Sequence, residues 1–299
     1  MQVLSRAIGL AVFVCTPVVA GAALYSNNEF NYCAGFICYD DWCAEQMCDK
    51  NGHAITGTVV KNNETGALEW IAEYQDGYPN GIQKIYFTNG RISEATTYKD
   101  GHRNGDAFSY YENGKIKSSG TYKNDHENGT FREYYENGRL SSVVVYRNGV
   151  KEGLEKTYNE DGTLLAEIPY KSGQVNGVRY TYFKNGSVLE AKNLKNGISD
   201  GITIGYYDNG VQEVEINYSN GKKDGTYIEY YPNGTLRREL NYTTGTLNGM
   251  AYWYNNDGTM VADANVTDNK IISGHKYDRN GIQTDMKDDE INEFQGKLK

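Results

Sequence analysis

The side chains best suited to chemistry in this 299-residue chain are four cysteines at an even spacing of five residues: Cys33, Cys38, Cys43 and Cys48. An even count favours two disulfides in an oxidising compartment, with three connectivities open. Zinc fits less well, because structural zinc sites usually join two separated ligand pairs, and only His53 stands nearby. No Cys-x-x-Cys is present, which argues against redox catalysis. We expect a disulfide-stapled cap.

The histidines and carboxylates do not form a recognisable reactive set. His102 and His126 occupy the same position 24 residues apart, but no third metal ligand accompanies them, so we interpret them as exposed turn residues. Aspartates such as Asp76 and Asp100 stand beside turns, where this residue type usually bonds its own backbone. No loop has the calcium-binding spacing of an EF-hand. The sequence therefore predicts no catalytic residues, no metal, no cofactor and no enzyme activity.

Residues 1–22 have the pattern of a cleaved secretory signal. Arg6 supplies the positive start, residues 7–20 form the apolar stretch, and Ala20-Gly21-Ala22 is a small-residue cleavage site. The alternative, a membrane anchor, would need about 20 apolar residues. We therefore expect export, with a periplasmic or extracellular location after cleavage.

The structural elements of the chain can be predicted from one glycine that recurs at a fixed spacing. It recurs every 24 residues, at Gly66, Gly90, Gly114, Gly138, Gly162, Gly186, Gly210, Gly234 and Gly258. The chain holds 27 Tyr and 34 Gly, and its mean hydropathy is −0.69, which is too polar for a large aliphatic core. Such a period indicates a repeat fold in which each unit contacts only its neighbours.

Each repeat is predicted to be a β-hairpin with a defined register. Two β-prone runs flank Asn137-Gly138, and a second glycine turn follows at Gly149. A two-residue loop would pair Tyr135 with Leu140, whereas a three-residue loop with a left-handed glycine would pair Tyr134 with Leu140. Pro232 favours the second reading, because it then occupies the turn position that proline prefers.

Tyrosine fills two columns of the repeat. The first column is Tyr86, Tyr110, Tyr134, Tyr158, Tyr182, Tyr206, Tyr230 and Tyr254. The second is Tyr74, Tyr98, Tyr122, Tyr146, Tyr170, Tyr218 and Tyr242. Counting residues along the strands places both columns on one face, where they provide either cohesion of the sheet through cross-strand pairs or a binding face.

These patterns predict an all-β chain, an elongated solenoid-like antiparallel sheet of 24-residue hairpins with a small Cys-rich N-terminal cap. The expected domains are a signal at 1–22, the Cys-rich cap at 23–51, the repeat array at 52–281, and a polar tail at 282–299 that contains a capping helix. Asp125 replaces a turn glycine and is expected to be a weak point.

The recurring Tyr-Tyr-x-Asn-Gly-x-Leu followed by Tyr-x-x-Gly-x-x-x-Gly resembles the bacterial variant of the MORN repeat; residues 230–249 match it fully, and residues 110–129 match it with Ile116 for Leu and Asp125 for the first turn Gly. The likeness covers about nine repeats. It implies a β-hairpin array without catalytic residues. Bacterial members are often labelled antitoxin-like, and eukaryotic relatives are associated with membrane tethering and protein scaffolding; the signal segment argues against an intracellular antitoxin.

The net charge of −9 disfavours phosphate-rich partners, because nucleic-acid and anionic-lipid binders need clustered Lys and Arg. We expect no nucleic acid. Another protein is the leading partner, glycan or cell-wall binding through the tyrosines is the alternative, and association with a membrane surface is the least favoured.

Overall fold

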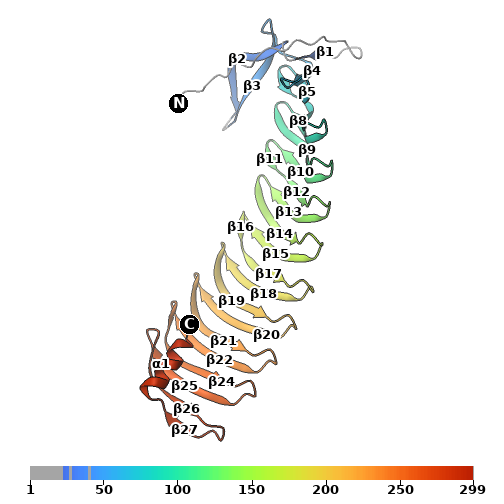
Figure 1. The fold of residues 1–299 in the computed structure, drawn as a ribbon. Helices are drawn as coiled ribbons and strands as arrows, with labels where there is room; N and C mark the ends of the chain where they lie inside the picture. Colours follow the sequence, from blue (N-terminus) through green and yellow to red (C-terminus); the bar gives the residue numbers. More distant parts are fainter. Residues whose placement is uncertain (1–22, 27–28, 40–41, 299) are drawn as a thin grey trace. The chain divides into compact units, whose positions relative to one another are not determined.

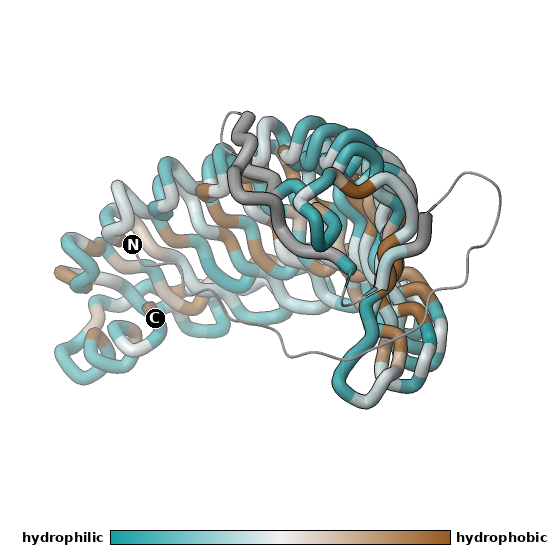
Figure 2. Tube along the Cα trace, turned by 90° about the horizontal axis from the view of Figure 1, so that it is seen from above, coloured by the Kyte–Doolittle hydropathy of each residue, from teal (hydrophilic) through white to brown (hydrophobic). Residues whose placement is uncertain are grey.

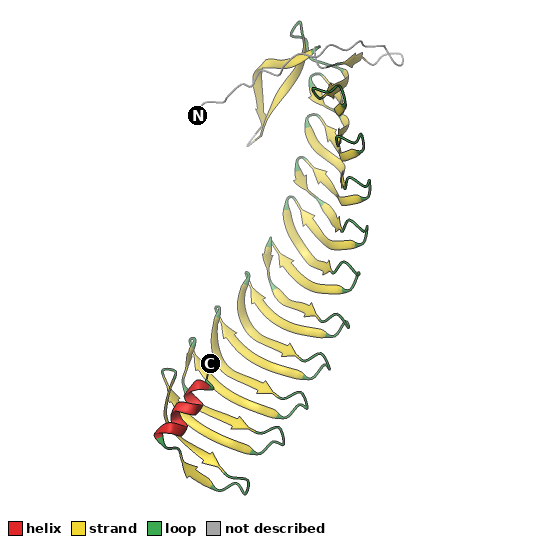
Figure 3. Cartoon of the chain, viewed as in Figure 1, coloured by secondary structure: helices red, strands yellow, loops and turns green. Residues whose placement is uncertain are grey.

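The computed structural model describes residues 23–26, 29–39 and 42–298 of the chain, so the predicted signal at 1–22 lies outside the described residues. The chain divides into two compact units, residues 1–150 and 151–299. Each unit is built from antiparallel β-hairpins, and a single α-helix closes the second (Figures 1 and 3). The predicted all-β hairpin fold is therefore confirmed.

The first unit begins with a short strand, continues with a separate two-stranded hairpin of β2 and β3, and then forms the sheet β4 to β13. The strands are β1 (Ala23–Tyr25), β2 (Phe30–Tyr39), β3 (Trp42–Asp49), β4 (Gly57–Asn62), β5 (Leu68–Gln75), β6 (Tyr78–Pro79), β7 (Gly81–Tyr86), β8 (Ile92–Lys99), β9 (His102–Tyr110), β10 (Ile116–Lys123), β11 (His126–Glu127), β12 (Gly129–Tyr134) and β13 (Leu140–Arg147). Strand β1 pairs in parallel with β4 and so covers the edge of the first hairpin.

The second unit contains the remaining hairpins and the helix. Its elements are β14 (Val150–Tyr158), which begins at the boundary, β15 (Leu164–Lys171), β16 (Gln174–Val175), β17 (Gly177–Tyr182), β18 (Val188–Lys195), β19 (Ile198–Tyr206), β20 (Gln212–Ser219), β21 (Lys222–Tyr230), β22 (Leu236–Thr243), β23 (Thr246–Leu247), β24 (Gly249–Tyr254), β25 (Met260–Thr267), β26 (Lys270–Tyr277), β27 (Gln283–Asp285) and α1 (Asp288–Gly296). The predicted C-terminal helix is thus present.

The hairpin loop is the three-residue type that the sequence predicts. In the repeat that contains Gly138, the N–H of Gly138 donates to the carbonyl of Tyr135, and the N–H of Tyr135 donates to the carbonyl of Arg139, both at 2.8 Å. Only Gly138 has a positive φ in this loop, at 91°, which excludes a type I′ turn at Asn137-Gly138. Tyr134 pairs with Leu140 beyond a β-bulge, as expected.

The second turn of each repeat has a different geometry. Asn148 and Gly149 have φ values of 49° and 78°, and positive values at both central residues define a type I′ turn. Asp125 takes the glycine position of this turn at φ 66°, and Asn269 does so at 64°. Asp and Asn tolerate this region better than other side chains.

The repeat continues beyond Gly258, where the sequence pattern weakens. Gly281 has φ 76°, its N–H donates to the carbonyl of Asp278, and the N–H of Asp278 donates to the carbonyl of Ile282. These are the bonds of the other hairpin loops, so β26 and β27 form one further hairpin, offset by 23 residues instead of 24.

Side chains of the hairpin loops also join successive repeats. In the second unit, Oδ1 of Asn209 accepts the N–H of Val211 in its own turn, while Nδ2 donates to the carbonyl of Pro232 in the next turn. The hydroxyl of Tyr207 similarly donates to the carbonyl of Tyr230, 23 residues on. The Asn and the second Tyr of the motif therefore act as connectors between repeats as well as parts of one hairpin.

Burial is shallow except at the two described ends. One small cluster contains Met47, Ile55 and Val59 in the first unit. In the second unit a larger cluster forms where α1 covers the last hairpins, with Phe294 only 2% exposed. Elsewhere apolar positions recur from strand to strand without gathering in one centre (Figure 2).

Candidate functional site

One face of the sheet carries the side chains of the first Tyr column, such as Tyr110 and Tyr182, and we call it face B. In the second unit, the hydroxyl of Tyr182 donates to Oε2 of Glu167 at 2.8 Å, and Glu167 is directly paired with Tyr180. In the first unit, the rings of Phe108 and Tyr110 lie 6.5 Å apart, which places these i and i+2 residues together. Burial, and then the neighbouring Glu167 carboxylate, raise the pKa of Tyr182 to about 12. All eight tyrosines of the column are half-buried.

The second Tyr column lies on the opposite face, face A. Phe131 contacts Tyr122 and Tyr146 edge-on, with ring centroids 5.4 and 5.1 Å apart. Phe131 and Tyr134 are three residues apart on the regular strand β12, so their side chains point to opposite faces. In the second unit Tyr242 likewise contacts Tyr227, at 6.3 Å.

The prediction that both Tyr columns share one face is therefore wrong. The reason is the β-bulge between the paired residues of each hairpin, for example between Glu133 and Tyr134. A bulge adds one residue to one strand, so counting residues through the turn inverts the face. The bulged loop was predicted from the sequence. The prediction did not allow for the extra residue, which changes which side chains of the second strand share a face with the first.

The cysteine segment forms the hairpin β2–β3. Cys38 and Cys43 are opposite one another in its backbone register. The side chains of Cys33, Cys38 and Cys43 lie outside the described part of the structure, whereas Cys48 is described and is 2% exposed. The pairing of the four thiols stays a prediction.

His102 is more than an exposed turn residue. Its Nδ1 lies 2.6 Å from Oδ2 of Asp125, whose Oδ1 accepts the N–H of Arg103 at 2.8 Å. Burial of Asp125 opposes its ionisation, but the bonds from Arg103 and His102 prevail and lower its pKa. Asp125 is therefore held by a network, contrary to the weak point that was expected. Across the described residues, no group of three or more His, Cys, Asp or Glu side chains could hold a metal ion.

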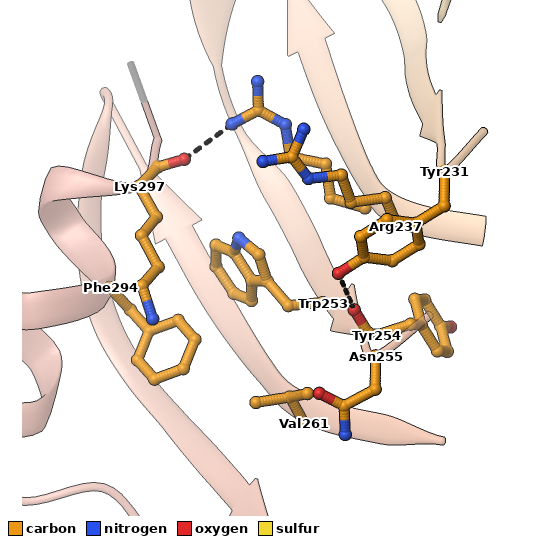
Figure 4. Close-up of a pocket in the computed structure, with 9 residues that line it drawn as sticks. Tyr231, Arg237, Trp253, Tyr254, Asn255, Val261, Phe294 and Lys297 are labelled. Atoms are coloured by element: carbon orange, nitrogen blue, oxygen red, sulfur yellow. Dashed lines mark hydrogen bonds between the residues drawn. The ribbon is translucent and has the colours of Figure 1, made fainter. Parts of the chain in front are cut away.

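The clearest concave site lies beside α1, in the second unit, and we call it the α1 pocket. It encloses about 450 Å³ (Figure 4). The lining residues come from β22, β24, β25, α1 and the loops that adjoin them: Tyr231, Arg237, Arg238, Trp253, Tyr254, Asn255, Val261, Phe294 and Lys297.

Small side chains explain why the helix sits at this place. Ala251, Ala262 and Ala264 are fully buried beneath α1, and their size leaves room for Phe294. The Phe294 ring meets the Trp253 indole at 5.1 Å and an interplanar angle of 62°. This edge-on contact fixes one wall of the α1 pocket.

Cationic side chains form another wall. Arg237 and Arg238 both bind Glu229, and Nη1 of Arg238 also donates to the carbonyl of Lys297 at 2.7 Å, which ties the end of α1 to the sheet. Burial disfavours the charged form of Arg238, but the Tyr227 hydroxyl and the Glu229 carboxylate outweigh it and raise the pKa of Arg238. Three cations thus share two carboxylates: Arg237 and Arg238 both bind Glu229, and Lys297 pairs with Glu293.

One buried donor in the α1 pocket has no partner. Trp253 is 7% exposed, and its Nε1–H makes no hydrogen bond with any described group. Figure 4 shows this nitrogen on the edge of the indole that points away from Phe294. An unsatisfied buried donor costs about 1–3 kcal/mol, so such a group needs an explanation, and an acceptor that enters the pocket would supply one.

The sequence did not predict this site. Arg237, Trp253 and Phe294 belong to different elements, and the tail residues lie outside the 24-residue pattern. The only available signal was the coincidence of small residues at Ala251, Ala262 and Ala264, where the preceding repeat carries Tyr227, Arg238 and Leu240. Among the described residues, no helix is long and apolar enough to span a membrane.

Comparison with known proteins identifies the repeat. Residues 79–100, 103–124, 127–148, 151–172 and 223–243 match the family model of the MORN repeat variant. The chain carries MORN-variant repeats. Each matched MORN segment contains one three-residue hairpin loop, and the unmatched segments 63–67, 183–187, 207–211, 255–259 and 278–282 have the same loop bonds. Repeats of this MORN-variant type suggest a repeat-based binding scaffold.

No curated protein matches the chain. Among solved structures, it is similar to "Crystal Structure of TcdB2-TccC3", with 13% identity over 79% of this chain and a TM-score of 0.19. A second similarity is to "Crystal Structure of TcdB2-TccC3-Cdc42", with 13% identity over 84% of this chain and a TM-score of 0.18. The MORN-repeat chain spans only 15% and 16% of those chains.

Proposed function

We propose that this MORN-variant chain is an exported, non-catalytic scaffold that binds another protein through face B of its second unit. The observation that carries the proposal is a column of exposed aliphatic side chains on that face. Leu154, Ile202 and Met250 are 45%, 40% and 36% exposed, at intervals of two repeats. A partner that lies along the sheet could cover these three side chains together, as partners cover exposed apolar surface at other interaction sites.

The same face supplies the polar part of an interface. Leu154 pairs with Pro169, and Ile202 pairs with Asn217, so the column runs beside the type I′ turns. The first Tyr column, including Tyr182 and Tyr206, follows the hairpin-loop end of face B. Tyrosine offers contact area and a hydroxyl at low entropic cost, which suits a protein partner.

The alternatives fit face B less well. Sugar binding usually needs exposed ring faces, and the first-column tyrosines are half-buried. Nucleic acid and anionic membranes are disfavoured by the net charge of −9. Catalysis needs a few groups in unequal environments, which a regular column of aliphatic and Tyr side chains does not supply.

Export rests on the signal pattern of residues 1–22, and we propose that the mature protein is periplasmic or extracellular. The backbone of β2–β3 supports a specific thiol pairing there. Cys38 and Cys43 are directly opposite, within the Cα separation that disulfides require, which leaves Cys33 for Cys48. Peptide mapping of the non-reduced protein tests this; four free thiols or another pairing would contradict it.

The binding proposal is tested by comparing partner capture from the native envelope or medium by three forms of the protein. The double variant Leu154→Glu/Ile202→Glu places charges in the exposed column and should lose at least tenfold of the captured partner. Ile282→Glu is the matched control, because Ile282 is equally apolar and 60% exposed but stands in the last hairpin loop, outside the column. Equal capture by all three forms would reject the face B interface. If the protein binds to a glycan array and Tyr206→Ala abolishes this binding, the partner is a sugar and not a protein.

A further inference from the structure

We propose that the α1 pocket is a second binding site, which takes a carboxylate side chain of a peptide segment flanked by apolar residues. The proposal deepens the scaffold function, since it rests on a protein partner, but it concerns a different surface from face B. Three observations support it: an unpartnered donor, an incompletely used guanidinium, and apolar walls around them.

The first observation is the Trp253 indole. Its Nε1–H is buried and unpaired, while the ring itself is held by Phe294. A buried indole that contacts Phe294 edge-on cannot serve as an open stacking platform for a sugar. It can donate one hydrogen bond to an acceptor that enters the pocket, and this would satisfy the group.

The second observation is the different engagement of the two arginines. All three nitrogens of Arg238 are used, by Glu229, by the Lys297 carbonyl and by the Tyr227 hydroxyl. Arg237 bonds Glu229 through Nη1 at 2.6 Å, and in the described structure its Nε and Nη2 make no hydrogen bond. Its side chain is 51% exposed, so these donors are accessible at the mouth of the pocket.

The third observation is the character of the remaining walls. The guanidinium of Arg237 lies 5.6 Å from the centre of the Tyr231 ring, and Tyr231 is fixed by its bond to the carbonyl of Tyr254. Val261 and Phe294 add apolar surface. Donors beside aromatic and aliphatic walls match a carboxylate carried next to an apolar side chain, because planar guanidinium groups pair well with carboxylates.

The test uses a matched pair of blocked peptides, Ac-Leu-Asp-Leu-NH2 and Ac-Leu-Asn-Leu-NH2, titrated into the full chain labelled with ¹⁵N. The chain has three tryptophans, so the indole region of the NMR spectrum holds three assignable cross-peaks. We expect the Asp peptide to shift the Trp253 indole N–H in a saturable manner, and the Asn peptide to bind about tenfold more weakly or worse. Arg237→Gln should weaken the binding of the Asp peptide about tenfold, whereas Lys270→Gln, which removes an exposed cation that does not line the pocket, should not.

The outcomes separate this site from face B. An unmoved Trp253 indole, equal shifts with both peptides, or an Asp-peptide affinity unchanged in Arg237→Gln would each reject the carboxylate site. An equal shift with inorganic phosphate would reject the peptide assignment in favour of a general anion site. Unchanged backbone cross-peaks in Arg237→Gln exclude misfolding as the cause. The Leu154→Glu/Ile202→Glu variant should bind the Asp peptide normally, so failure of either proposal leaves the other testable.

Discussion

The Asn of the hairpin loop offers a direct measure of how strongly one repeat holds the next. In Asn209→Asp, the Oδ1 acceptor for the Val211 N–H is kept, while the Nδ2 donor to the Pro232 carbonyl is lost. The bond is solvent-exposed at 3.1 Å, so its net contribution is about 0.5–1 kcal/mol. The new carboxylate oxygen would also face the Pro232 carbonyl, and we expect a total loss of about 1 kcal/mol.

The appropriate assay is native-state hydrogen exchange, because repeat arrays open locally and need not unfold in two states. A loss of about 1 kcal/mol corresponds to roughly fivefold faster exchange at the following hairpin, including the Gly234 N–H that closes its loop. Exchange at distant repeats should change little, because coupling is mainly between neighbours.

A natural Asp supplies the control. Asp161 occupies the same loop position, and its partner across the repeats is Lys184, at 3.3 Å. Asp161→Asn exchanges this exposed ion pair for a possible amide bond and should alter exchange less than twofold. If Asn209→Asp is also neutral, or if it acts equally on all repeats, the connector role of Asn is wrong.

Three further changes have defined outcomes. Phe294→Ala removes the ring that contacts Trp253 and should lower the stability of the terminal cluster by about 3–5 kcal/mol. We expect a red shift of Trp emission and the loss of α1 at a lower temperature on heating; an unchanged emission would contradict the packing. Gly120→Ala places a Cβ 2.3 Å from the Phe131 ring and should destabilise the first unit by about 1–3 kcal/mol in urea unfolding, whereas full stability would show that the ring can move. The lowered pKa of Asp125 means that its ionised form stabilises the fold above its ordinary pKa, near 3.8, and that this contribution disappears as pH falls through the lowered value. Asp125→Asn should therefore be less stable than the parent at pH 6, and the difference in thermal melting should shrink as pH falls below 3.8 through the lowered pKa; a difference that stays constant would refute the charge assignment.

The local geometry of the repeat was predictable because glycine and proline restrict the backbone strongly. Gly138 and Pro232 were sufficient to select the three-residue loop and the Tyr134–Leu140 pair, both of which the structure contains. The assignment of the Tyr columns to faces was wrong because side chains alternate between the two faces only along a regular strand, and the extra residue of the bulge interrupts this alternation. The role of Asp125 was missed because its partner His102 is 23 residues away, beside the type I′ turn of the preceding repeat, and only the stacking of successive repeats brings the two together.

The α1 pocket was unpredictable from the repeat because it depends on departures from it. In the second unit, the position of Ala251 is occupied in earlier repeats by Tyr227, Thr203, Arg179 and Glu155. A helix can approach face A closely only where this side chain is small. The helix therefore marks the last repeats as different from the rest of the array, and it completes the large buried cluster of the described second unit, beside which the cationic groups of the α1 pocket lie.

This explanation can be tested by making the last repeat resemble its neighbour. Ala251→Tyr introduces the residue found at Tyr227, one repeat earlier, into a site that is fully buried under α1. Overpacking should cost about 1–3 kcal/mol and displace the helix, because the sheet itself already accepts tyrosine at this register. Circular dichroism should retain the strand signal, while the Trp253 indole moves to a solvent-exposed environment and loses its response to the Asp peptide. Met250→Tyr, on the exposed face B, is the control and should leave both unchanged. A helix that stays in place in Ala251→Tyr would show that its position is set by Arg238 and its bond to Lys297, and not by the small residues of the last repeat.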